Sequence, residues 1–205
     1  MRLSRAVHLI LLAALLVGCA PTAPAAAESP LTTLTASLVD GLRHGGLYIV
    51  LRHGADTGKD NLNVDPADCA NQGALTDAGR QELSAMGASI ASLSLPIGDV
   101  LASPYCRTLE TARIVFGKAV ASDLLVRPPG GAPLANDDPR LAAIKRMLAA
   151  IPATGTDMVL VTHSQIMRAV FGLDAVLGES VIVQPKVSGG YVILARIGVR
   201  GWKRP

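Results

Sequence analysis

The feature that most constrains this chain is a short apolar segment that ends abruptly in two basic residues. Residues 47–51 form a run rich in β-forming side chains, and Arg52 and His53 follow it at once. Runs of this length and composition are typical of strands buried on both faces of a parallel sheet. Open α/β sheets bind ligands at the carboxyl ends of their strands, so Arg52 and His53 are predicted to lie at such an edge.

The same arrangement occurs twice more along the chain. The apolar run 100–102 leads through Ser103 to Arg107, and the run 158–161 leads to His163. A helical pattern follows each of these segments, which indicates strand–helix units and an α/β fold. If the three strand ends meet, two arginines and two histidines surround one point. Guanidinium groups match phosphate oxygens well, so the sequence predicts a phosphate site there.

At these residues the chain resembles the histidine phosphatase superfamily, which includes phosphoglycerate mutases and phosphohistidine phosphatases. The resemblance implies a three-layer α/β/α sandwich with a mostly parallel central sheet. The length of 205 residues suits one domain, which is expected over residues 31–205. It covers roughly residues 44–197, and four segments carry it in the family's order: Leu51-Arg52-His53-Gly54, Leu75-Thr76-Asp77-Ala78-Gly79-Arg80-Gln81, residues 103–112, and Val161-Thr162-His163-Ser164.

The resemblance also implies a reaction that needs neither metal nor cofactor. His53 would attack phosphorus to form a phosphohistidine, which water then hydrolyses, while Arg52, Arg107 and His163 bind the phosphoryl group. The residues suit these roles, because one imidazole nitrogen can attack only if the other donates its hydrogen elsewhere. A backbone carbonyl near Gly54 is the expected acceptor.

The general acid departs from the family's pattern. Many members carry a Glu between the helix after the second strand and the final His, whereas the short insert 124–139 offers only Asp137 and Asp138. Asp138 and Glu179 are the candidate general acids, and the alternative for Glu179 is a loop carboxylate without a chemical role. Loss of a general acid costs about 10²–10⁴-fold, so aryl phosphates and phosphoramidates are expected to react faster than alkyl phosphates.

A long polar loop, residues 55–74, is predicted to form the rim of the site. Its four aspartates lack the spacing of a calcium loop and are interpreted as solvated charges, so no metal site is predicted: they are Asp56, Asp60, Asp65 and Asp68.

The first 18 residues have the pattern of a secretory signal peptide. Arg2 and Arg5 precede an uncharged apolar run that is too short to span a bilayer. The end of this segment resembles the bacterial lipobox, so Cys19 is expected to be lipidated and residues 19–30 to form a flexible tether. The alternative is an ordinary signal cleaved after residues 25–27. By resemblance to sorted lipoproteins, Ala20 after Cys19 favours the outer membrane.

An exported protein can keep disulfides, and two cysteines remain beyond Cys19. Cys69 lies in the loop after the first strand, and Cys106 directly precedes Arg107 at the end of the second. These strand ends should be neighbours, so a Cys69–Cys106 disulfide is predicted; the alternative is two buried thiols.

The amino-acid composition indicates which kinds of partner the protein can bind. Half of the 205 residues are hydrophobic and 17% are charged, which indicates a globular protein. Without Arg2 and Arg5 the chain carries 17 basic and 16 acidic residues and no basic run, so no nucleic acid partner is expected. The expected partners are a phosphorylated small molecule or envelope sugar phosphate, and a membrane through the N-terminal lipid anchor. The competing hypothesis is a non-catalytic phosphate- or phosphosugar-binding lipoprotein, also facing the periplasm.

Three further elements are predicted outside these segments. Residues 31–43 have helical periodicity, residues 124–126 are expected to form a short strand, and two strands at 181–183 and 191–197 are expected to be joined by a turn at Ser188-Gly189-Gly190.

Overall fold

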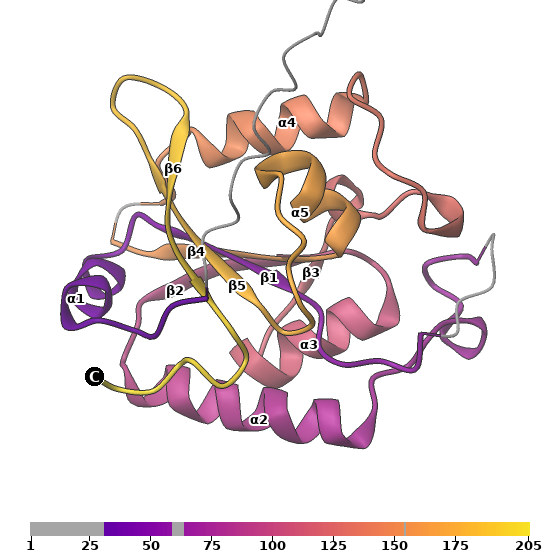
Figure 1. Cartoon of the computed structure of the whole chain (residues 1–205), viewed down its shortest axis with the longest axis horizontal. Helices are drawn as coiled ribbons and strands as arrows, with labels where there is room; N and C mark the ends of the chain where they lie inside the picture. The colour runs from indigo at the N-terminus through magenta and orange to yellow at the C-terminus, as the bar shows by residue number, and fades with distance from the viewer. Residues whose placement is uncertain (1–30, 59–63, 154) are drawn as a thin grey trace, which may run out of the picture.

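A computed structural model describes residues 31–58, 64–153 and 155–205. The expected signal peptide, the tether, Cys19 and Asp60 lie outside the described residues. A single six-stranded sheet has helices on both of its faces (Figure 1), which confirms the predicted α/β class. In the described part of the chain, no helix has the length and apolarity needed to cross a membrane.

The sheet is mostly parallel, as predicted. Its strand order is β3-β2-β4-β1-β5-β6. The first four strands in this order run parallel, β5 is antiparallel to β1, and β6 is antiparallel to β5. The strands are β1 (Tyr48–Arg52), β2 (Ile97–Ala102), β3 (Val120–Ala121), β4 (Asp157–Thr162), β5 (Ser180–Pro185) and β6 (Tyr191–Ile197).

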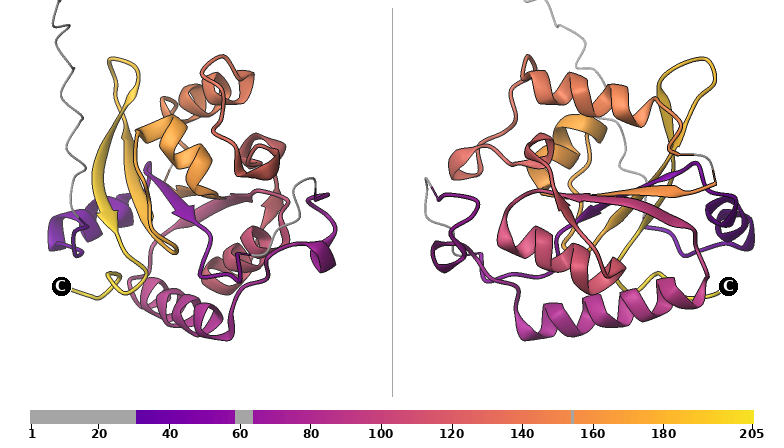
Figure 2. Two further views of the ribbon diagram at one scale, coloured as in Figure 1. Left: turned by 45° about the vertical axis from the view of Figure 1, so that its right-hand side comes forward. Right: turned by 180° about the vertical axis from the view of Figure 1, so that it is seen from behind.

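Helices cover the sheet in two separate layers. Figure 2 shows α2 (Asp77–Ser92) and α3 (Cys106–Phe116) on one face, with α4 (Pro139–Leu148) and α5 (Ser164–Phe171) on the other. The N-terminal helix α1 (Ala36–His44) contributes side chains to the core on the α2 and α3 side. It begins later than predicted, because Thr35 accepts a hydrogen bond from the Leu38 amide and caps it.

Strand β1 is apolar up to its last residue, Arg52, because both of its faces are buried. Ile49 and Leu51 belong to the core under α1, α2 and α3, whereas Tyr48 and Val50 belong to the core under α4 and α5. Alternate side chains of a strand point to opposite faces, so a strand between two helical layers needs apolar residues at every position.

The strand predicted at residues 124–126 is wrong. A short 3-10 turn occupies Asp123–Leu125, and the edge strand β3 lies just before it. Leu125 is buried in the core under α4 and α5, and its carbonyl accepts a hydrogen bond from Oγ1 of Thr162 at 2.9 Å. The apolar residues of this segment pack into that core instead of extending the edge of the sheet.

Candidate active site

The carboxyl ends of β1, β2 and β4 meet, as the sequence predicts. Strand β4 lies between the other two, and the residues that follow these strands reach one cavity of about 290 Å³. The rings of His53 and His163 lie with their centroids 5.2 Å apart. Arg52 and Arg107 also line this cavity, so the structure brings all four predicted phosphoryl-binding residues together.

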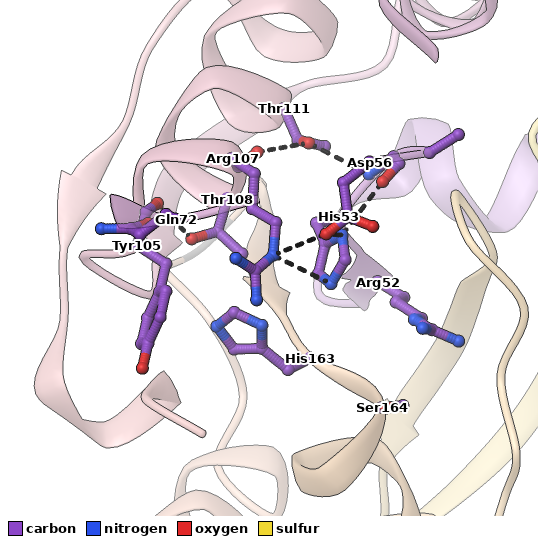
Figure 3. Close-up of polar contacts among 12 residues, drawn as sticks. Arg52, His53, Asp56, Gln72, Tyr105, Arg107, Thr108, Thr111, His163 and Ser164 are labelled. Carbon is purple, nitrogen blue, oxygen red and sulfur yellow. Dashed lines mark hydrogen bonds and ion pairs between the residues drawn. The ribbon is translucent and has the colours of Figure 1, made fainter. Parts of the chain in front are cut away.

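His53 presents an unprotonated nitrogen toward Arg107 (Figure 3). Its Nδ1 lies 3.0 Å from the carbonyl oxygen of Gly54, which can only accept a hydrogen bond, so Nδ1 carries the proton. Its Nε2 lies 3.4 Å from Nε of Arg107, which can only donate. The lone pair on Nε2 is therefore directed to the side of the ring where Arg107 lies.

Packing holds the main chain beside His53 in place. A Cβ atom on Gly54 would lie 2.6 Å from a methyl carbon of Leu83, closer than packed atoms approach, so any other residue would require the buried Leu83 side chain to move. The amide of Gly54 donates to Oγ1 of Thr111 at 3.1 Å. The carbonyl that fixes the His53 tautomer therefore belongs to a residue anchored to both α2 and α3.

His163 is almost fully buried, and its two ring nitrogens have different surroundings. Nε2 lies 2.9 Å from Oγ of Ser103, whereas Nδ1 is buried without a hydrogen-bond partner in the described structure. Burial lowers the pKa of His163 well below its usual value, and the positive charges of Arg107, Arg127 and Arg52 lower it further, as protonation of His53 would. The ring is therefore neutral near pH 7 and carries one N–H hydrogen.

The two predicted arginines are held by different partners. Arg107, in the first turn of α3, is buried and lies with its Nε 3.1 Å from Oδ2 of Asp56. Arg52, at the end of β1, donates from a terminal nitrogen to the carbonyl oxygen of Ala175 at 2.6 Å. Partial burial is the main cause that lowers the pKa of Arg52.

Asp56 is not the solvated loop charge that the sequence suggests. The loop folds back, so that Asp56 bridges to Leu75 and the Thr57 amide donates to the Ala74 carbonyl. This arrangement leaves the Asp56 side chain only 12% exposed, beside both His53 and Arg107. The contact joins residues 56 and 75, which are far apart in the sequence, so the local sequence pattern could not reveal it.

The structure brings neither candidate general acid to the cavity. Glu179 is fully buried, lies 2.6 Å from Nε of Arg196, and accepts a hydrogen bond from the Val176 amide. Asp138 caps the N-terminus of α4 and lies 2.7 Å from Arg140. Both carboxylates have structural roles: buried Glu179 needs a cation and amide donors around it, and partly exposed Asp138 caps a helix.

A third arginine, which the sequence pattern did not predict for the site, lines the cavity. Arg127 is 5% exposed, and its Cζ lies 4.9 Å from the ring centroid of Tyr105. It belongs to the segment between α3 and β4, where many members of the resembled family carry an acid. The available signal was an arginine placed directly after the apolar residues 124–126.

The rim loop is fastened to the start of α3. Cys69 and Cys106 form the predicted disulfide, with their Cα atoms 5.6 Å apart. The side chain of Gln72 adds to this connection, because it accepts from the Cys106 amide and donates to the carbonyl of Pro66. Arg107 therefore follows a residue that is held both covalently and by hydrogen bonds.

Metal ligands do not gather in the described residues. Residues 31–58, 64–153 and 155–205 contain no group of three or more His, Cys, Asp or Glu side chains that could hold a metal ion.

The fold is similar to that of solved structures that include a protein histidine phosphatase. The protein histidine phosphatase SixA complexed with tungstate has a TM-score of 0.55 and 16% identity, covering 75% of this chain and 97% of SixA. YhfR of Bacillus stearothermophilus has a TM-score of 0.56 and 16% identity, and the match covers 77% of this chain and 99% of YhfR. Phosphoserine phosphatase of Entamoeba histolytica, complexed with 3-phosphoglyceric acid, has a TM-score of 0.53 and 14% identity. The match covers 76% of this chain and 98% of the phosphatase. The chain matches no protein-family model and no curated protein.

Proposed function

We propose that this protein is a metal-independent phosphatase that hydrolyses phosphate monoesters or phosphoramidates through a phosphohistidine on His53. The observation that carries the proposal is the pair of contacts made by the His53 ring, which leave the proton on Nδ1 and the lone pair on Nε2. A nucleophilic imidazole needs this tautomer, with the attacking nitrogen free of hydrogen.

The first half of the reaction transfers the phosphoryl group to His53. Arg52 and Arg107 bind the phosphoryl oxygens, and Nδ1–H of His163 donates a further hydrogen bond. Nε2 of His53 attacks phosphorus while the bond from phosphorus to the leaving oxygen or nitrogen breaks, and its electron pair departs with the leaving group. Fixed cations of this kind act by stabilising the charge of the transition state.

The second half releases inorganic phosphate. A water molecule attacks phosphorus, the bond from phosphorus to Nε2 breaks, and the imidazole recovers its lone pair. The proton lost by the water passes to solvent or phosphate, so that no metal ion or other reactant is needed.

The surroundings of the carboxylates favour substrates with good leaving groups. Glu179 and Asp138 are held in structural ion pairs away from the cavity, and Asp56 is paired with Arg107. Without an acid to protonate the leaving atom, alkyl phosphates should react more slowly than aryl phosphates by about 10²–10⁴-fold. A phosphoramidate also suits the site, because its nitrogen can take a proton before it leaves.

Two of the similar solved structures support an oxyanion site. One of those proteins is complexed with tungstate, a tetrahedral oxyanion like phosphate, and another with 3-phosphoglyceric acid. The competing proposal is a protein that binds a phosphate or sugar phosphate without turnover, and the structural roles of Glu179 and Asp138 favour it.

Hydrolysis of para-nitrophenyl phosphate in the presence of EDTA tests the proposal, with protein that begins at Ala20. Turnover should survive EDTA and disappear in His53→Ala, whereas His44→Ala, which removes an exposed histidine of α1, should behave like the wild type. Acid-labile radioactive phosphate on the wild-type chain, absent in His53→Ala, would identify the intermediate. Phosphate binding without turnover would favour the binding protein, and full activity in His53→Ala would exclude this mechanism.

We also propose an N-terminal lipid anchor on Cys19, facing the periplasm, from the sequence pattern alone. Labelling of cells with radioactive palmitate should mark the wild-type chain and leave Cys19→Ser unlabelled. Label on both chains, or on neither, would contradict the anchor.

A further inference from the structure

The cavity is larger than the phosphoryl group needs. Its volume is about 290 Å³. A phosphoryl group has four heavy atoms and fills roughly the volume of two to three water molecules, at about 30 Å³ each. The remaining space extends along residues that the phosphatase mechanism does not use: Arg127, Gly130, Gly131, Ser164 and Gln165.

Arg127 is held in one position beside this space. Its Cζ lies 4.9 Å from the Tyr105 ring centroid, and a terminal nitrogen donates to the Pro128 carbonyl at 3.3 Å. The neighbouring turn leaves room next to it, because a Cβ atom on Gly131 would come within 3.8 Å of Arg127 and 3.4 Å of Gln165. A guanidinium keeps its charge at any physiological pH, so this is a fixed cation.

The position of Arg127 relative to the phosphoryl site is limited by one shared aromatic ring. The Cζ atoms of Arg107 and Arg127 lie 5.0 and 4.9 Å from the centroid of Tyr105. The two Cζ atoms can therefore be no more than about 10 Å apart. The same ring lies 4.9 Å from the ring of His163.

Electrostatics independently connects Arg127 to the reaction centre. After burial, His53 and Arg107, the charge of Arg127 is the next largest cause that lowers the pKa of His163, ahead of Arg52. The charge of Arg127 therefore acts on His163, one of the residues that line the cavity.

We propose that Arg127, together with the turn Gly130-Gly131 and the side chain of Gln165, forms a second anion site. The preferred substrate is then a small phosphate ester with a second anionic group, a carboxylate or another phosphate. One anion binds at His53, Arg52, Arg107 and His163, and the other binds at Arg127. This proposal can be tested in two ways. A comparison of substrate turnover rests on the proposed phosphatase function, whereas a comparison of ligand binding does not.

A matched pair of substrates isolates the second anion. 4-Carboxyphenyl phosphate and 4-carbamoylphenyl phosphate have the same shape and similar leaving groups, and differ by one negative charge. Hydrogen bonds to charged groups contribute about 1.5–3 kcal/mol, so the wild type should prefer the carboxylate by about 10- to 100-fold in kcat/KM, mainly through KM. Benzene-1,4-diol bisphosphate, used as a third probe, shows which anion is preferred.

Substitution of Arg127 should remove this preference. Arg127→Met keeps a long side chain against Tyr105 and should bring the ratio of carboxylate to amide close to one, while Arg127→Lys should retain part of it. Arg146→Met, which removes one exposed arginine of α4, should leave the ratio unchanged. Because a ratio is measured, a general loss of activity in a variant does not affect the result. A wild type without preference, or an Arg127→Met enzyme with an undiminished one, would overturn the proposal.

A binding measurement separates this proposal from the phosphatase function. The rise in Tm caused by each probe is measured in His53→Ala and in the double variant with Arg127→Met. A larger rise with the carboxylate than with the amide, lost when Arg127 is replaced, supports the second site even if no turnover exists. Equal rises with both probes in His53→Ala contradict it even if the wild type is an active phosphatase.

Discussion

The hydroxyl oxygen of Ser103 lies 2.9 Å from Nε2 of His163, and both side chains are buried. Since His163 is neutral, only one of its nitrogens carries hydrogen. If the serine hydroxyl donates to Nε2, the hydrogen is on Nδ1, the nitrogen without a partner in the described structure. We infer that Ser103 donates to Nε2 and so positions His163 as a donor toward a bound phosphoryl group.

Replacement of Ser103 by Ala should weaken catalysis without changing the fold. One hydrogen bond contributes about 0.5–1.5 kcal/mol, so kcat/KM should fall about 3- to 10-fold. Nitrogen NMR of the imidazole should show that His163 changes from one tautomer to a mixture. An unchanged tautomer together with reduced activity would mean that Ser103 acts in some other way.

Asp56 should oppose the binding of phosphate. Its carboxylate is paired with Arg107 at 3.1 Å, where an anionic ligand would also bind. Asp56→Asn removes a negative charge from the cavity, so the inhibition constant for inorganic phosphate should fall about threefold to tenfold, in keeping with about 1 kcal/mol for one net hydrogen bond. Inhibition assays at low and high salt measure this. Weaker inhibition in the variant would instead show that Asp56 mainly holds Arg107 in place.

Asp157 should make stability depend on pH. Burial raises its pKa to about 7, although the Leu47 amide donates to one of its oxygens. The folded protein therefore holds this proton more tightly than the unfolded chain. The resulting stabilisation is fully present below the unfolded pKa, near 4, and is lost as the pH rises to about 7.

An asparagine at position 157 cannot ionise and should remove this dependence. In the wild type, Oδ2 of Asp157 is buried without a partner in the described structure. The ionised carboxylate should therefore lower the free energy of unfolding by about 1–3 kcal/mol at pH 8. In denaturant unfolding, Asp157→Asn should then be more stable than the wild type at pH 8. This advantage should be smaller at pH 5. The exposed Asp99→Asn serves as control. A difference that stays constant between pH 5 and 8 would contradict the prediction.

The disulfide should contribute to stability and to the shape of the site. A separation of 37 residues corresponds to a loop-closure contribution of up to about 4 kcal/mol. Protein that begins at Ala20 has two cysteines, so a thiol assay should find none before reduction and two after it. Cys69→Ala with Cys106→Ala should lower Tm and raise KM, because the residue before Arg107 is released. Free thiols in the unreduced protein would be the contrary result.

Local patterns predicted those parts of the molecule that depend on neighbouring residues. The apolar run before Arg52 identifies β1, and Thr76 marks the start of α2 as its cap. The ends of parallel strands must meet at one edge of the sheet, so the meeting of Arg107 with His163 also followed from the sequence.

Contacts between distant segments were not predictable in the same way. Glu179 looked like a loop carboxylate that could reach the cavity, but its partner Arg196 is on β6, and the register of two antiparallel strands brings them together. Asp56 looked solvated because its bridge to Leu75 crosses a long loop. Arg127 was missed because its position depends on how its segment packs against Tyr105.

The buried ring of Tyr105 contacts Arg107, Arg127 and His163, so one side chain packs against residues of both the phosphoryl site and the proposed second anion site. Residues that share a partner show non-additive effects when they are mutated. Substitutions at Arg107 and Arg127 should therefore depend on each other's presence. A change of substrate during evolution would be easier at Gly130 and Gly131, which line the cavity, than at this common ring.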